Sequence, residues 1–194
     1  MDLARSFSHV FKDSSWFFKV FVGGLFLILS MAGVGIPFVL GYEARHVASI
    51  SRQQDSALPE WKRLSGIFRE GMTIVAAMLV YLTVIILTAA GAAGGHLDGV
   101  TIGVGAMAAL AAKPLLIILY VRRKTFIGCF RLDDVMRSVF HHPALFAVGL
   151  GVSFLTVLGT LALGWMSLIL GWPFVIFWGI IVNAHIAGQL ATIS

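Results

Sequence analysis

Lys113 is the residue best suited to chemistry, because it interrupts an apolar run from Val100 to Val121. A lysine at the centre of a membrane helix costs about 2.5–3.5 kcal/mol on insertion scales, so such residues usually face a protein interior or a wet cavity. The following Pro114 removes one helical hydrogen bond and leaves a carbonyl open to polar contact. Two interpretations remain open. Either the ammonium group pairs with Glu43 or Glu70 inside a bundle, or it reaches the membrane surface while its stem covers apolar surface.

His185 and Gln189 form a second polar group within a long apolar run. They are four positions apart, which places them on one face of a helix. Polar side chains in such positions most often link helices, and each hydrogen bond contributes about 0.6 kcal/mol. A histidine is also a ligand for metals and pigments, but a lone histidine gives little support for that role. Lys113, His185 and Gln189 are therefore the candidate intramembrane polar site.

The sequence contains no recognisable catalytic motif. We find no paired carboxylates within an apolar run, no His-Glu-x-x-His motif, no nucleophile elbow and no phosphate-binding loop. The single cysteine, Cys129, excludes an internal disulfide and cannot by itself bind a structural metal. We therefore expect no enzymatic activity, no catalytic residue, no metal and no cofactor.

The composition is typical of a membrane protein. Hydrophobic residues make up 59% of the 194 residues and charged residues only 12%, whereas soluble domains are about one quarter charged. One core cannot hide this much apolar surface from water, so lipid must solvate part of it. The net charge of +5 does not indicate nucleic-acid binding, because the basic residues lie beside apolar runs and form no continuous stripe.

The hydrophobicity pattern predicts an all-α, polytopic transmembrane helical bundle in a single domain. A spanning helix needs about 20 apolar residues, and four runs reach that length in addition to an N-terminal one. The expected parts are an interfacial N-terminal segment at 1–19, a helical hairpin or fifth span at 20–42, a connector at 43–70, spans at 71–93 and 100–121, a second connector at 122–142, and spans at 144–163 and 168–189.

The basic residues are concentrated in the two connectors. Segments 43–70 and 122–142 hold five arginines and lysines each, whereas the links at 94–99 and 164–167 hold none. By the positive-inside rule both connectors are cytoplasmic, and Trp165 then lies at the outer interface. We therefore expect a multi-pass protein of the cell's inner (cytoplasmic) membrane, with its C-terminus in the cytoplasm.

The run from Val20 to Tyr42 has two possible paths. Arg5, Lys12 and Lys19 favour a cytoplasmic N-terminus, which requires the run to enter the membrane and return to the same side. The stretch from Ala32 to Pro37 contains glycine and proline that break helices, and each arm of about 15 residues reaches only about 22 Å. The alternative is one kinked span with the N-terminus outside.

Both connectors contain a stretch with an amphipathic pattern. In 60–71 and 126–140, aromatic and aliphatic residues recur at helical spacing between charged ones, which is typical of helices in the headgroup plane. The alternative is an ordinary loop that continues a helix. The residues expected to contact lipid headgroups are Arg45, Trp61, Arg122, Arg123 and Lys124.

Small residues four positions apart recur within the apolar runs. Such spacing permits close approach of two helices. We expect packing of this kind at Gly99-x-x-x-Gly103, at Gly105-x-x-x-Ala109 and at Gly149-x-x-x-Ser153.

Several strings of the sequence resemble one family. They are Phe7…Phe11-Lys12-Asp13-Ser14-Ser15-Trp16 with Gly23-Gly24-Leu25, Gly41-Tyr42-x-x-Arg45, Leu58-Pro59-Glu60-Trp61, Phe68-x-x-Gly71, and Ala184-His185-Ile186-Ala187-Gly188-Gln189. Together they resemble the bacterial and archaeal membrane family called "domain of unknown function 4013" over nearly the whole chain. The resemblance implies an integral membrane protein with no assigned activity, and it transfers no catalytic residue.

Two functions remain open. The glycine-rich runs and the lack of a soluble domain or catalytic groups favour a non-catalytic accessory or scaffolding subunit, which contacts membrane lipids and other membrane protein subunits. The break near Gly33–Pro37 and the intramembrane Lys113 favour the alternative, a small transporter or lipid-handling protein.

Overall fold

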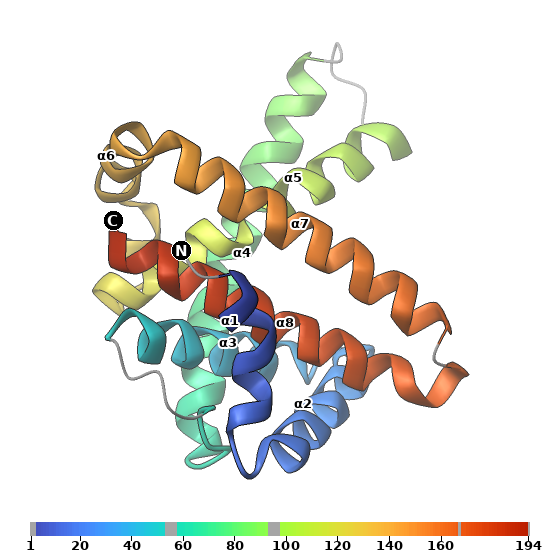
Figure 1. Ribbon diagram of the computed structural model, residues 1–194. Helices are drawn as coiled ribbons and strands as arrows, with labels where there is room; N and C mark the ends of the chain where they lie inside the picture. The colour runs from blue at the N-terminus through green and yellow to red at the C-terminus, as the bar shows by residue number, and fades with distance from the viewer. Residues whose placement is uncertain (1–2, 53–57, 93–97, 167, 194) are drawn as a thin grey trace.

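The computed structural model describes residues 3–52, 58–92, 98–166 and 168–193. These ranges contain helices and turns but no strand, which confirms the predicted all-α class. The helices, shown in Figure 1, are α1 (Leu3–Ser8), η1 (His9–Lys12), α2 (Trp16–Ser30), α3 (Ile36–Ser51), α4 (Leu64–Ala92), α5 (Gly99–Arg123), η2 (Ile127–Phe130), α6 (Leu132–His141), α7 (Pro143–Met166) and α8 (Leu168–Ile193).

Three helices in the described ranges are long and apolar enough to cross a membrane. They lie at Leu64–Ala92, Pro143–Gly164 and Gly171–Thr192, within α4, α7 and α8. The segments Ser6–Lys12 and Trp16–Ser30 are together also long and apolar enough to cross a membrane, although the chain bends by 110° between them. The predicted span at 100–121 forms the helix α5 but is not among the three. The chain is thus a helical membrane protein, whereas the predicted four spans with a hairpin or fifth span are not confirmed.

The run from Val20 to Tyr42 is divided between α2 and α3. The two helices are separated by Met31–Gly35, where Gly33 adopts a φ of 81°, a left-handed conformation that favours glycine. Pro37 lies in the first turn of α3, where its missing N–H costs no hydrogen bond. Phe26 and Phe38 stack across the break with centroids 4.5 Å apart, so α2 and α3 pack on each other, and together they are called the hairpin below. The entry and return of this run on one side of the membrane stays a prediction.

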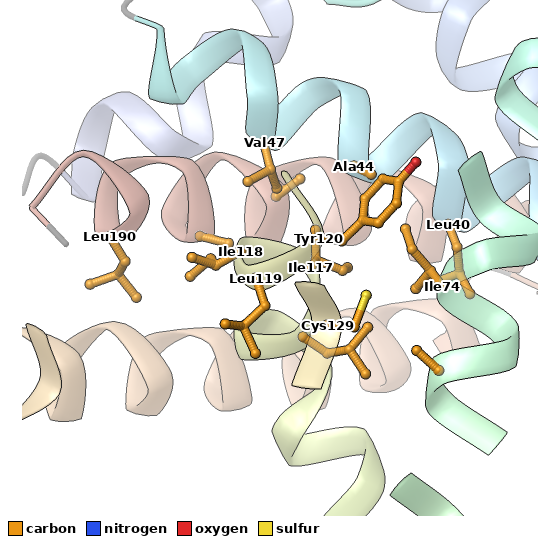
Figure 2. Packing of buried hydrophobic residues seen from close by; sticks show 14 of the residues in the cluster. Leu40, Ala44, Val47, Ile74, Ile117, Ile118, Leu119, Tyr120, Cys129 and Leu190 are labelled. Carbon is orange, nitrogen blue, oxygen red and sulfur yellow. The ribbon is translucent and has the colours of Figure 1, made fainter. Parts of the chain in front are cut away.

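α3 is the central helix of the bundle and packs against α2, α4, α5 and α8. Figure 2 shows the larger of two buried clusters, in which side chains of all these helices except α2 meet. Val47 of α3 and Leu190 of α8 lie beside Ile118 of α5 in this view. These aliphatic side chains pack on one another, and the buried residues of this cluster are all hydrophobic.

Two glycines allow α3 and α4 to approach each other at backbone distance. A Cβ atom at Gly41 would overlap the carbonyl oxygen of Ile67, and one at Gly71 would overlap the carbonyl oxygen of Pro37. Each glycine therefore faces the backbone of the opposite helix. The contact holds the start of α4 against α3.

The two connectors adopt different structures. Residues 64–71 of the first amphipathic stretch form the opening turns of α4, so they are neither a separate helix nor a loop. In the second connector, η2 and α6 lie between α5 and α7. The links at 94–99 and 164–167 fall partly outside the described residues, as do the side chains of Arg5 and Trp165.

We expect Gly71→Ala to lower the melting temperature of the protein in mild detergent. The added methyl group meets the backbone of Pro37, and overpacking of this kind costs about 1–3 kcal/mol. Gly151→Ala is the control, because nothing lies within 4 Å of its added methyl group. Removing a helical glycine there should stabilise the protein by about 0.5–1 kcal/mol. Equal melting temperatures for the two variants would contradict the close approach of α3 and α4.

Candidate functional site

Three groups of buried polar residues lie around α3. The first is an ion pair between α3 and α5, the second joins the N-terminal segment to the first connector, and the third is a cluster of histidines between η1, α3 and α8. Together they contain the buried aspartate, glutamate, lysine and histidine side chains of the described residues.

Lys113 forms an ion pair with Glu43. Its Nζ lies 2.8 and 2.9 Å from the two carboxylate oxygens of Glu43, and the side chains are 19% and 3% exposed. Of the two sequence interpretations, the structure therefore shows the paired one, with Glu43 as the partner. A buried lysine that is neutralised in this way needs no substrate to satisfy its charge.

Glu70, the other proposed partner of Lys113, binds Arg45 instead. Arg45 Nε and Nη2 donate to the two Glu70 oxygens at 3.2 and 3.0 Å, and Nη1 donates to the carbonyl of Lys62 at 3.2 Å. Arg45 thus ties α3 to α4 and to the connector before it. Both side chains remain partly exposed, so the pair lies near the surface.

Asp13 joins the N-terminal segment to the first connector. One of its carboxylate oxygens accepts from Lys19 Nζ at 2.7 Å and from the Leu58 amide at 2.8 Å, while the other accepts from the amide and hydroxyl of Ser15, both at 2.8 Å. Lys19 Nζ also donates to the Leu58 carbonyl at 2.7 Å. We call Asp13, Lys19 and Leu58 the N-terminal clasp.

The clasp fixes the charge of Asp13. Burial raises the pKa of this carboxyl group, but hydrogen bonds from Lys19, Ser15 and Leu58 lower it more. Its pKa therefore lies well below its usual range, and the group is ionised at neutral pH.

Trp61 lies inside an aromatic cluster rather than projecting freely from the first connector. Its indole N–H donates to the carbonyl of Lys19 at 3.0 Å, and its ring stacks on Tyr42 with centroids 4.3 Å apart. Phe26 stacks on it at 4.9 Å. Lys19 and Tyr42, at the two ends of the hairpin, therefore contact the same tryptophan.

His185 and Gln189 meet the N-terminal segment. His185 Nδ1 lies 2.9 Å from Ser6 Oγ and 3.0 Å from Gln189 Nε2, which donates to Ser6 Oγ at 3.2 Å. The shared face predicted for this pair is therefore used to bind the chain's own first helix. The predicted grouping of Lys113 with His185 and Gln189 is not observed, because Lys113 bonds to Glu43 in a separate contact.

Two further histidines pack beside His185. The His9 ring lies 4.6 Å from the His185 ring and 5.4 Å from the His46 ring, measured between centroids, and all three side chains are buried. Burial lowers the pKa of His46, and the neighbouring histidines His9 and His185 lower it further, so its imidazole is neutral. Within the described ranges, no group of three or more His, Cys, Asp or Glu side chains is arranged to hold a metal ion.

The other predicted residues are divided between the interior and open surface. Gly105 packs on Ile86 of α4, and Gly149 packs on Leu190 of α8. Nothing lies within 4 Å of a Cβ atom built at Gly99 or Gly103. Arg122 is partly buried at the end of α5, whereas Arg123 and Lys124 are exposed there.

Sequence reasoning did not select Asp13, His9 or His46 as site residues. The available signal was Asp13 itself, an acidic residue between basic ones in a segment that otherwise reads as a basic anchor. His9 and His46 gave no signal, because their partners lie far away along the chain.

We expect Lys113→Met to lower the free energy of unfolding by about 3–5 kcal/mol, because it leaves the Glu43 carboxylate buried without a cation. The double variant Lys113→Met/Glu43→Gln removes both charges and should be more stable than the single variant. Unfolding in mild detergent measures both. Lys62→Met is the control, since its ion pair with Glu60 is exposed and should contribute little. A double variant that is no more stable than Lys113→Met would contradict the ion pair.

We expect Asp13→Asn to destabilise the protein by about 3–5 kcal/mol at pH 7, because Lys19 loses its buried counter-ion. The depressed pKa of Asp13 means that its stabilisation is present above the unfolded pKa of about 3.9 and is lost as the pH falls toward the folded pKa. The difference in melting temperature between wild type and Asp13→Asn should therefore be constant from pH 5 to 8 and shrink below about pH 4. A difference that is independent of pH down to pH 2 would contradict the clasp.

Comparison with known proteins places the chain in a family. Residues 24–183 match the family model described as "Protein of unknown function (DUF4013)", which confirms the resemblance seen in the sequence. No curated protein and no solved structure matches the chain. The matched range contains the hairpin break, the Glu43–Lys113 ion pair and Trp61, and it covers more than half of the sequence. The chain therefore belongs to the DUF4013 family of proteins of unknown function.

Proposed function

We propose that this protein is a non-catalytic accessory or scaffolding subunit, which packs against other membrane proteins in the cytoplasmic membrane. The single observation that carries the proposal is a close-packing motif on α5 that has no partner within the described chain. Nothing lies within 4 Å of a Cβ atom built at Gly99 or at Gly103, and both residues are exposed. Small residues four positions apart let a second helix approach at backbone distance.

The same proposal draws support from the long helices, which are only partly covered. Of the most apolar stretch of each helix, 17% is buried within the protein in α4 and 28% in α7, compared with 61% in α8. α8 is therefore the inner helix, while α4 and α7 present most of their apolar surface outward. These surfaces suit lipid and the spans of a partner.

The four glycines predicted to pack against helices differ in their contacts. Gly105 and Gly149 already contact neighbouring helices of the same chain. Gly99 and Gly103 do not, although they lie on the same helix as Gly105. The open pair is thus the part of the packing motif that remains for another protein.

The transporter alternative has less support. Its two motives were the break near Gly33–Pro37 and the intramembrane Lys113, and the charge of Lys113 is neutralised by Glu43. Three pockets lie beside Arg45, beside Phe11 and beside Phe7, and Lys113 lines none of the three. Removing one partner of a buried ion pair is destabilising, so a structural role accounts for Lys113 without a substrate.

The proposed orientation places the N-terminus, both basic connectors and the C-terminus in the cytoplasm. It is supported by the contacts of Trp61 with Lys19 and Tyr42, since these two residues flank the hairpin and lie against one connector. The bond between Ser6 and Gln189 likewise brings the N-terminal segment to the last turns of α8. Both contacts favour entry and return of the hairpin on one side.

The proposal is tested by purifying the tagged, full-length chain from its native membrane in mild detergent. We expect a particle larger than the monomer and at least one co-purifying membrane protein, identified by mass spectrometry. Gly99→Leu/Gly103→Leu should release this protein without lowering the melting temperature, because the leucines fill open space within the chain.

The matched control is Gly151→Leu/Gly159→Leu, which fills open space on α7 at positions that do not form the four-residue motif. It should retain the partner. A strictly monomeric wild-type particle would end the accessory proposal. Retention of the partner by both double variants would show that the open face of α5 is not the contact.

A further inference from the structure

A small polar pocket lies where three helices come together. It has a volume of about 190 Å³ and is formed by the second half of α3, the start of α4 and the end of α5. Its charged lining residues are Arg45 of α3, Arg52, which follows α3, Glu70 of α4 and Lys124, which follows α5. It is separate from the Glu43–Lys113 ion pair and from the histidine cluster.

The charges around this pocket do not balance. Arg45 and Glu70 neutralise each other through the two hydrogen bonds described above. Arg52 and Lys124 are exposed, and neither side chain has a hydrogen bond or ion pair within residues 3–52, 58–92, 98–166 and 168–193. Two positive charges from separate helices therefore face one hollow.

The backbone brings Lys124 to this position. Lys124 has a φ of 52°, in the left-handed region, and its N–H donates to the carbonyl of Tyr120 at 2.6 Å. This geometry ends α5 and turns the chain sharply at the pocket. A basic residue at one helix end is explained by the helix dipole alone. The dipole does not explain why the cations of two different helix ends share one pocket.

The pocket also contains a hydroxyl group. Tyr120 lines it, and Figure 2 shows the phenol oxygen beside Ala44, another lining residue. No hydrogen bond to this oxygen is present in the described part of the chain. The pocket thus combines a phenol O–H with an ammonium and a guanidinium group.

We propose that this pocket binds one phosphate group, with Arg52 and Lys124 as ionic contacts and Tyr120 as a hydrogen-bond donor. A guanidinium group suits a phosphate because it offers two parallel N–H donors. Both basic connectors contribute a cation to this pocket, Arg52 from the first and Lys124 from the second. We assign this surface to the cytoplasmic face, where anionic lipids are enriched. The phosphate of an anionic lipid headgroup and a soluble phosphate share this chemistry, and the site is independent of the accessory role.

The test uses the full-length protein in mild detergent, titrated with short-chain phosphatidylglycerol while the melting temperature is followed. We expect a saturable rise in melting temperature. Arg52→Gln/Lys124→Gln should raise the half-saturating concentration about 25-fold, because each cation near a membrane surface contributes about fivefold. Tyr120→Phe should raise it about tenfold, the usual effect of one hydrogen bond to a charged group.

Lys12→Gln/Arg137→Gln is the matched control. It removes the same number of positive charges from exposed positions outside the pocket, so the half-saturating concentration should change less than twofold. One further titration, with inorganic phosphate, identifies the source of the phosphate. Saturable stabilisation by inorganic phosphate as well would identify a soluble phosphate, whereas stabilisation by phosphatidylglycerol alone would identify a lipid headgroup, and either result upholds the site.

The proposal is overturned if no phosphate compound shifts the melting temperature, or if both double variants weaken binding equally, which would indicate general surface attraction. If Arg52→Gln/Lys124→Gln melts at a lower temperature without ligand, Tyr120→Phe decides, because it removes only one oxygen atom. An unchanged half-saturating concentration in Tyr120→Phe would then overturn the site.

Discussion

The carboxylate of Glu43 is buried in the middle of the molecule, and much of the packing follows from the need to neutralise it. A buried carboxylate that loses its counter-ion destabilises the folded protein by about 3–5 kcal/mol. Lys113 supplies the counter-ion and thereby brings α5 to α3. The aliphatic residues that follow Lys113 on α5, Ile117 and Ile118, then fill the space beside Val47 of α3.

Three of the strings that resemble the family, Gly41-Tyr42-x-x-Arg45, Leu58-Pro59-Glu60-Trp61 and Phe68-x-x-Gly71, meet where α3 contacts α4 and the connector before it. Gly41 and Gly71 let the two backbones meet, Tyr42 stacks on Trp61, and Arg45 binds Glu70. Each string is short, but in the fold they touch one another. This explains why a family with no assigned activity still has recognisable motifs: these residues specify architecture, and a motif of this kind need not mark a reaction.

The sequence predicted features that depend on local pattern and failed on features that depend on distant partners. Helical class, the break after Ser30 and the shared face of His185 and Gln189 all follow from spacing and residue type. From its charge, Lys113 was expected to pair with Glu43 or Glu70. Only the packing of α5 against α3 shows that the partner is Glu43. The histidine cluster was not predicted, because Ser6 and His185 are 179 positions apart and no local pattern links them.

This separation has a consequence for how the protein is made. The helix α1 is synthesised well before the turns of α8 that contact Ser6 and His9. At about 5–20 residues per second, the interval is roughly 10–35 s. During that time α1 lacks the contacts that it makes with α8 in the folded protein. Synthesis of His185 and Gln189 therefore completes the site on α8 that contacts α1, and a chain that stops before His185 lacks all of these contacts.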